Sequence, residues 1–139
     1  MRKIITAVVL GLAAAGAFAQ QPEADAAEAA KVAAQSWLAQ IDGAHYAASW
    51  DMAAPAFQAA VSKADWEKSI ASLRAPMGAV EKRELIAASY KERLPGAPPG
   101  PYVVIQYRSQ FANKKAAVET LTPMKSADGS WHVSGYFVK

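Results

Sequence analysis

The chain has 139 residues, a formal net charge of +3 and no cysteine. Without cysteine it forms no disulfide and carries out no thiol chemistry, and a structural zinc site has lost its commonest ligand. Arg2 and Lys3 lie in a segment that we expect to be removed, which lowers the formal charge to about +1. The sequence also has no basic stripe with interleaved aromatic residues. These features argue against a nucleic-acid-binding protein.

The segment Met1–Ala19 has the pattern of a bacterial secretory signal. It opens with two basic residues and continues with an apolar run, Ile4–Gly16, that is too short and too rich in small residues for a good membrane span. Ala17-Phe18-Ala19 matches the A-x-A cleavage pattern. We expect cleavage after Ala19, which leaves a single domain of residues 20–139 in the periplasm or outside the cell, without stable membrane insertion.

Four helical segments are expected after this signal. Ala24–Ile41 is rich in alanine, has no Gly or Pro, and places apolar residues at helical spacing, with Trp37 as the main anchor. The three shorter segments are Tyr46–Met52, Pro55–Ala60 and Lys63–Leu73. The helical region is therefore predicted to fill the amino-terminal half of the domain.

The last of these helices has clear start and stop signals. Ser62 is the expected N-cap, and Pro76 and Gly78 end the helix. The next segment, Val80–Tyr90, permits either a helix or a strand. We favour a strand, because the sheet that follows needs a neighbour. Leu94–Pro101 is predicted to be an irregular connection stiffened by proline.

The last third of the chain predicts three antiparallel strands. They are Tyr102–Phe111, Lys115–Lys125 and Ser130–Val138, joined by turns at Asn113-Lys114 and Asp128-Gly129. With the strand before them, they indicate an α+β fold in which N-terminal helices pack on one face of an antiparallel sheet of about four strands.

These turns predict which side chains share a face of the sheet. The mainly apolar face comprises Val103, Ile105, Tyr107, Phe111, Ala116, Val118, Thr120, Thr122, Met124, Trp131, Val133, Gly135 and Phe137. The outer face is mixed and includes Leu121 and Tyr136, with Arg108 opposite Glu119. We expect that pair either to set the register, for roughly 0.2–1 kcal/mol, or to bind a ligand or partner. The apolar residues on the outer face predict partial cover by a second copy, in a homodimer.

Several short stretches together resemble a known family. They are Trp37-Leu38, Ile41-Asp42-Gly43, Ser49-Trp50, Gly100-Pro101-Tyr102-Val103-Val104 and Asp128-Gly129-Ser130-Trp131. Their order and spacing resemble the domain of unknown function 4019 family of small exported bacterial proteins. This family has no assigned activity, so the resemblance implies no catalytic residues. The order of elements also resembles the nuclear-transport-factor-two-like, or cystatin-like, roll, which implies helices on one face of a curved sheet.

No strong catalytic motif is present. The sequence has no nucleophile elbow, P-loop, glycine-rich dinucleotide turn or H-E-x-x-H. His45 and His132 are far apart, and a metal site would need further ligands beside one of them. We expect no metal and no cofactor.

One cluster of polar and aromatic residues follows the first helix. It consists of Asp42, His45, Tyr46, Trp50 and Asp51. In a pocket between helices and sheet, a carboxylate beside a His or Tyr could act as an acid–base pair. The alternative, which we favour, is that these residues are ordinary helix-end, loop, core and solvated positions.

Two arginines, Arg74 and Arg83, flank the turn after the last helix. They could bind an anion, but we favour surface charges. Two classes of function remain. The first is a non-catalytic exported domain that binds a protein partner, itself or cell-envelope material through the outer face, with Arg108, Glu119 and Tyr136 as candidates. The alternative is a small-molecule-binding or enzymatic roll. A filled aromatic interior favours the first, and a cavity with Asp or His turned inward favours the second.

Overall fold

The computed structural model describes residues 15–139, so most of the predicted signal lies outside the described residues. The helices are α1 (Ala15–Asp42), α2 (Tyr46–Asp51), α3 (Pro55–Ala60) and α4 (Lys63–Arg74), followed by a 3₁₀ turn, η1 (Ala75–Met77). The strands are β1 (Val80–Lys91), β2 (Tyr102–Phe111), β3 (Lys114–Lys125) and β4 (Trp131–Val138). Within this part of the chain, no helix combines the length and apolar character needed to cross a membrane.

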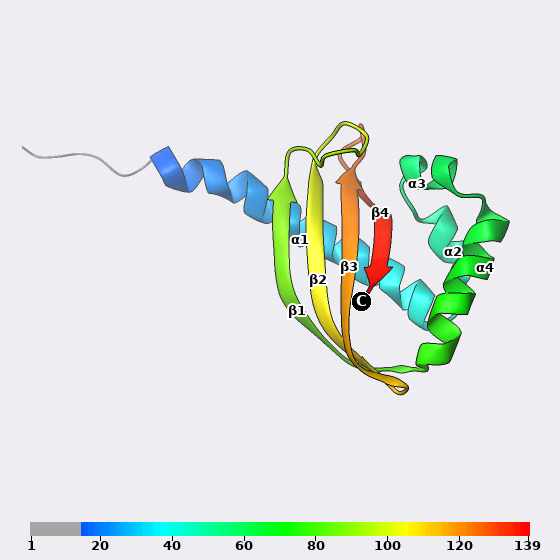
Figure 1. Ribbon diagram of the computed structural model, residues 1–139. Coiled ribbons are helices and arrows are strands. Elements are labelled where there is room, and N and C mark those ends of the chain that lie inside the picture. The colour runs from blue at the N-terminus through cyan, green and yellow to red at the C-terminus, as the bar shows by residue number, and fades with distance from the viewer. Residues whose placement is uncertain (1–14) are drawn as a thin grey trace, which may run out of the picture.

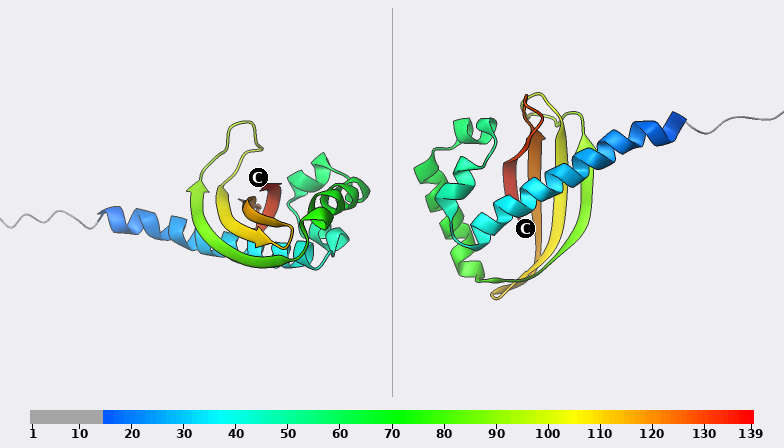
Figure 2. Two further views of the ribbon diagram at one scale, coloured as in Figure 1. Left: turned by 60° about the horizontal axis from the view of Figure 1, so that its bottom comes forward. Right: turned by 180° about the vertical axis from the view of Figure 1, so that it is seen from behind.

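The four strands form one antiparallel sheet in the order β1-β2-β3-β4. Helix α1 crosses one face of the sheet diagonally, and α2, α3 and α4 lie beside the β4 edge (Figures 1 and 2). The predicted α+β fold, with helices packed on a curved antiparallel sheet, is confirmed. The face turned away from α1 is called the outer face below.

Local sequence signals explain where the helices begin. Ser62 is the N-cap of α4 and accepts a hydrogen bond from the backbone NH of Asp65 at 3.2 Å, as the sequence predicts. Pro55 occupies the first turn of α3, where the missing NH costs nothing. Helix α1 begins at Ala15, before the predicted start at Ala24, and it contains Pro22. The ambiguous segment Val80–Tyr90 is a strand, so this prediction is confirmed.

The core lies between α1 and the sheet. Its main members are Ala30, Ala34, Trp37, Leu38, Ile41, Trp66, Ile70, Val103, Ile105, Tyr107, Leu121, Trp131 and Val133. Alanines let α1 approach the strands closely, and Trp37 fills the space beside them. The Trp37 indole NH donates to the backbone carbonyl of Ser49 at 2.9 Å, so this buried donor is satisfied. Trp37 therefore joins α1 to both α2 and the sheet.

The register predicted for β2 and β3 is wrong by one residue. Tyr107 faces Glu119 and Arg108 faces Val118, so the predicted Arg108–Glu119 pair does not form. The turn is Ala112-Asn113 rather than Asn113-Lys114, because Asn113 NH donates to the Met77 carbonyl at 2.8 Å. A register irregularity follows between Ser109 and Phe111. A shift of one residue exchanges the faces, so the odd-numbered side chains from Ala117 to Pro123 of β3 face the core.

The predicted inward position of Phe137 is also wrong. A bulge between Leu121 and Pro123 changes the register partway along β3 and β4. Trp131 and Val133 near the turn remain buried, as predicted, but Phe137 is 59% exposed. Tyr136 turns towards α1 instead, and its ring lies 5.2 Å from that of Trp37. The Asp128-Gly129 corner is present within a longer connection.

Candidate functional site

The predicted cluster after the first helix does not gather around one cavity. Its members are Asp42, His45, Tyr46, Trp50 and Asp51. Asp51 is exposed and pairs with Lys63 at 2.9 Å, and His45 is exposed at the start of α2. Trp50 and Tyr46 are half-buried against the core, and the Trp50 indole NH donates to the Val61 carbonyl at 2.9 Å. Only Asp42 enters a larger polar group.

That group is a network of four charged side chains from four elements. Asp42 at the end of α1 accepts hydrogen bonds from Arg74 of α4 at 2.9 Å and from Arg83 of β1 at 2.8 Å. Arg83 also donates to Glu119 of β3 at 2.7 Å. Arg74 is 5% exposed and lies over the Phe111 ring. The prediction that Arg74 and Arg83 are surface charges is therefore wrong.

Glu119 is the fully buried centre of this network. Its carboxylate accepts two hydrogen bonds from Arg83, at 2.7 and 3.1 Å, one from Ser109 at 2.5 Å and one from Tyr136. These donors come from β1, β2 and β4, so each of the other strands contributes one residue. A buried carboxylate needs this degree of pairing, since an unpaired one costs several kcal/mol.

The network shifts the pKa values of Asp42 and Tyr136. Burial raises the pKa of Asp42, but hydrogen bonds from Arg83 and Arg74 outweigh it and hold that pKa below its ordinary value. Burial, followed by the negative charge of Glu119, raises the pKa of the Tyr136 hydroxyl well above its ordinary value. The Asp42 carboxylate therefore remains charged at neutral pH, and Tyr136 remains protonated. Such an arrangement fixes the position of strands and helices.

A small pocket of about 220 Å³ borders this network. It is lined by Gln35, Leu38, Ala39, Asp42, Arg83 and Tyr107. The Tyr107 hydroxyl is buried and has no hydrogen-bond partner among residues 15–139. Asp42 and Arg83, however, already satisfy one another. We therefore assign this pocket to the network and its structural role.

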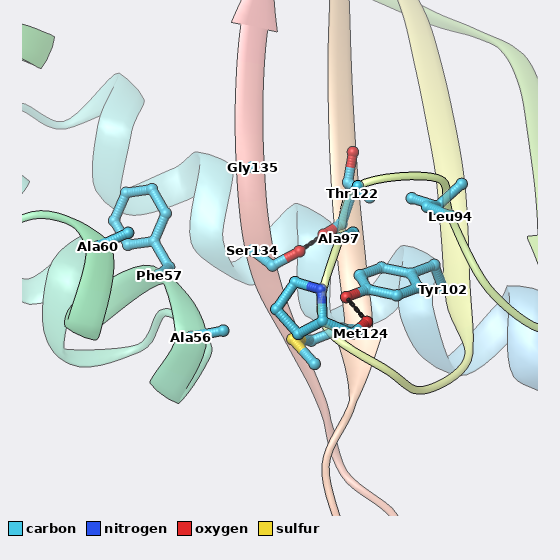
Figure 3. A pocket seen from close by; sticks show the side chains of 12 residues that line it. Ala56, Phe57, Ala60, Leu94, Ala97, Tyr102, Thr122, Met124, Ser134 and Gly135 are labelled. Carbon is cyan, nitrogen blue, oxygen red and sulfur yellow. Dashed lines mark hydrogen bonds between the residues drawn. The ribbon is translucent and has the colours of Figure 1, made fainter.

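A larger pocket, of about 400 Å³, lies on the outer face of the sheet. Its floor is formed by β3 and β4, one wall by α3, and the other by the connection after β1 (Figure 3). The lining residues are Ala56, Phe57, Ala60, Leu94, Gly96, Ala97, Pro98, Tyr102, Thr122, Met124, Ser134 and Gly135. None of these pocket residues was predicted as a binding residue from the sequence. The predicted proline-stiffened connection Leu94–Pro101 was the only available signal.

Internal hydrogen bonds fix the polar groups of this outer pocket. The Tyr102 hydroxyl donates to the Pro98 carbonyl at 2.6 Å, which holds the connection over the sheet (Figure 3). The Ser134 hydroxyl donates to the Thr122 carbonyl, also at 2.6 Å. Both hydroxyl hydrogens are thus used, and their oxygens present lone pairs. Gly135 has no side chain to occupy the floor of the pocket. A Cβ added there would meet only Thr122, at 3.8 Å, so a larger side chain fits at this position.

The remaining predicted site residues divide between the two faces. Arg108 is exposed on the outer face, as expected. Glu119 and Tyr136 belong to the buried network on the α1 side, because the register differs from the predicted one. The binding candidates that the sequence placed together therefore lie on opposite faces of the sheet.

The comparisons with known proteins give a family without an assigned activity. No curated protein and no solved structure matches the chain. Residues 33–136 match the model of a protein family described as "protein of unknown function (DUF4019)". This match covers the last third of α1, the other helices and nearly the whole sheet. The chain therefore belongs to the DUF4019 family.

Proposed function

We propose that this protein is an exported, non-catalytic binding domain whose ligand site is the outer pocket. The observation that carries the proposal is the pocket of about 400 Å³ between α3, the 92–101 connection and the outer face. This volume falls within the range of pockets that bind small molecules. The site joins the two surfaces suggested by the sequence, the outer sheet face and a pocket between helix and sheet.

The lining indicates the chemical class of the group that binds there. The described residues that surround the pocket include no charged side chain and no histidine. Most of its surface comes from alanine, proline, leucine, methionine and aromatic side chains. A neutral, mainly apolar group is therefore favoured, because a charged group would be desolvated there without a partner. The hydroxyl oxygens of Tyr102 and Ser134 can each accept a hydrogen bond from such a group.

The same lining supports a binding role without catalysis. Acid–base catalysis needs a titratable group within reach of the substrate. The carboxylates that are brought together in the described chain, Asp42 of α1 and Glu119 of β3, lie on the α1 side of the sheet and are paired with arginines. A cavity with Asp or His turned inward would favour an enzyme, and the outer pocket has neither.

Export is supported by the pattern of Met1–Ala19. Its basic start, short apolar run and A-x-A motif are typical of a cleaved signal. We expect the periplasmic protein to begin at Gln20, which intact mass spectrometry of the fractionated protein checks. A full-length cytoplasmic product would contradict export but would leave the pocket intact.

Ligand binding can be tested with N-phenyl-1-naphthylamine, a neutral dye that fluoresces in apolar surroundings. Wild-type protein should enhance its emission, and Gly135→Val should abolish most of the enhancement by filling the pocket. The backbone at Gly135 does not have a positive φ, so valine fits the strand without strain. Native mass spectrometry of the purified protein should also show a co-purified ligand.

Ser89→Val is the matched control, because it adds the same side chain to an exposed position of β1 that does not line the pocket. It should bind the dye as wild type does, and circular dichroism should show that both variants fold. Equal binding by Gly135→Val, or no binding by wild type, would overturn the proposed site.

Self-association is a second use of the same face, favoured by the exposure of Phe137. The predicted homodimer would cover this ring. Light scattering at high protein concentration checks it: a dimer that Phe137→Ser converts to a monomer supports it, and a wild-type monomer excludes it.

A further inference from the structure

We propose that the natural ligand is a single-chain anionic amphiphile, such as a fatty acid or an alkyl phosphate. Its alkyl chain would lie in the outer pocket and its anionic head at the basic end of the outer face. This inference rests on the proposed function, since it specifies the ligand of the same pocket. The observation behind it is a continuous outer-face surface with an apolar pocket at one end and cations at the other.

The side chains that connect the two ends all lie on the outer face. Thr122 and Met124 of β3 line the pocket. Thr120 lies two residues from Thr122 along the same strand, and it pairs with Gln106 of β2 on one side and with Phe137 of β4 on the other. Two residues further is Val118, opposite Arg108. The path from Thr122 to Val118 spans four strand residues, or roughly 13 Å. One extended alkyl chain covers such a distance.

The middle of this path suits an alkyl chain. Phe137 is 59% exposed, although large aromatic side chains usually bury most of their surface. The Gln106 amide donates to the Thr120 hydroxyl at 3.4 Å, which partly satisfies the polar groups beside it. Val118 is partly exposed at the far end. A bound chain would cover the Phe137 ring.

The far end of the path is positively charged. Two shallow pockets share Arg108 and Lys115 in their linings, one with Lys82 and Glu84, the other with Lys139. Glu84 pairs with Lys82 at 3.0 Å, and Lys115 pairs with Glu81 at 2.9 Å. Arg108 has no ion-pair partner within 4.0 Å among the described residues and lies opposite Glu84 in the register.

The balance of charge at this end therefore selects an anion. Three cations, Lys82, Arg108 and Lys115, stand against Glu81 and Glu84. The guanidinium of Arg108 can bind a carboxylate or a phosphate through two parallel hydrogen bonds. A neutral amphiphile would use only the pocket, and a small anion without a chain would use only the basic end. An anionic head on an alkyl chain uses both.

The test is displacement of bound N-phenyl-1-naphthylamine by reagents that share one chain and differ in the head group. Dodecanoate and dodecyl phosphate should displace the dye at concentrations about five- to ten-fold lower than dodecanol, each kept below its aggregation limit. Acetate and inorganic phosphate should not displace it. The preference for anions should weaken as salt is raised, because the head site is exposed.

Arg108→Gln should reduce the preference for dodecanoate over dodecanol to near one, without changing dodecanol binding. Lys68→Gln removes the same charge from an exposed site on α4 and should keep the wild-type preference. If dodecanol and dodecanoate compete equally in wild type, the anionic head is wrong and the apolar pocket stands. If Arg108→Gln weakens the binding of dodecanoate and dodecanol equally, Arg108 does not bind the anionic head and the proposed head site is wrong. If the dye does not bind at all, the proposed function itself fails.

Discussion

Tyr136 of β4 donates a hydrogen bond to Glu119 of β3, and both side chains face α1 rather than solvent. The sequence pattern placed both residues on the exposed side of the sheet. Their true position turns two ordinary polar residues into the centre of the buried network. The stability of the fold should therefore depend on Glu119 much more than on any exposed carboxylate.

We predict that Glu119→Gln lowers the free energy of unfolding by about 3–5 kcal/mol, because it leaves Arg83 facing a neutral amide in a buried site. Urea unfolding followed by tryptophan fluorescence measures this change. Glu84→Gln is the control: Glu84 is an exposed residue paired with Lys82, so the loss should stay below about 1 kcal/mol. Equal losses in the two variants would contradict the buried position of Glu119.

The acid side of the stability profile should depend on Asp42. The pKa of Asp42 in the folded protein lies below its ordinary value of 3.8, so the unfolded state takes up a proton first as pH falls. The stability that Asp42 contributes is complete above that value and is lost as pH falls below it. Asp42→Asn should cost about 1.5–3 kcal/mol at pH 7, and its difference from wild type should shrink below pH 3.8.

Unfolding free energies measured at neutral and acid pH check the role of Asp42. Asp51→Asn removes a carboxylate from an exposed pair with Lys63 and should show a small difference at neutral pH. A difference for Asp42→Asn that stays constant down to the lowest pH would show that the carboxylate is not titrating in this range.

The alkaline side should depend on Tyr136. Burial and the charge of Glu119 raise the pKa of its hydroxyl above the ordinary value of 10.0, so the unfolded state loses this proton first as pH rises. The contribution of Tyr136 is present below pH 10 and is lost above it. Tyr136→Phe should cost about 1.5–3 kcal/mol at pH 7. Unfolding measured through pH 11 should show this cost decreasing, and a constant cost would contradict the buried hydrogen bond.

The sequence predicted the elements well because their signals are local. The N-cap at Ser62, Pro55 in the first turn of α3 and alternation in β2 each depend on a few neighbouring residues. The strand at Val80 followed from the need of the sheet for a neighbour. These features give the α+β architecture, the order of the elements and the aromatic core around Trp37.

The pairing of the strands depends on contacts that no local pattern reveals. The turn at Ala112-Asn113 is held by the carbonyls of Met77 and Ala79, which are far away in sequence. The bulge at Leu121 then exchanges the positions of Tyr136 and Phe137. The network and the outer pocket both follow from these two irregularities. The outer pocket, whose lining comes from α3, the 92–101 connection, β2, β3 and β4, gives no spacing motif.

The register itself can be tested by comparing two large-to-small substitutions. Ile105 is fully buried in both the predicted and the observed pairing, whereas Phe137 is inward only in the predicted one. We predict that Ile105→Ala lowers the free energy of unfolding by about 2–5 kcal/mol through cavity formation. Phe137→Ala should cost no more than about 0.5 kcal/mol, because its ring is already solvated. Urea denaturation of the two variants measures both values.

A loss of about 3–5 kcal/mol for Phe137→Ala, typical of a buried aromatic residue, would restore the predicted register and remove Phe137 from the outer face. Since the alkyl path to Arg108 crosses this ring, the same result would also end the proposed route from the pocket to the basic end.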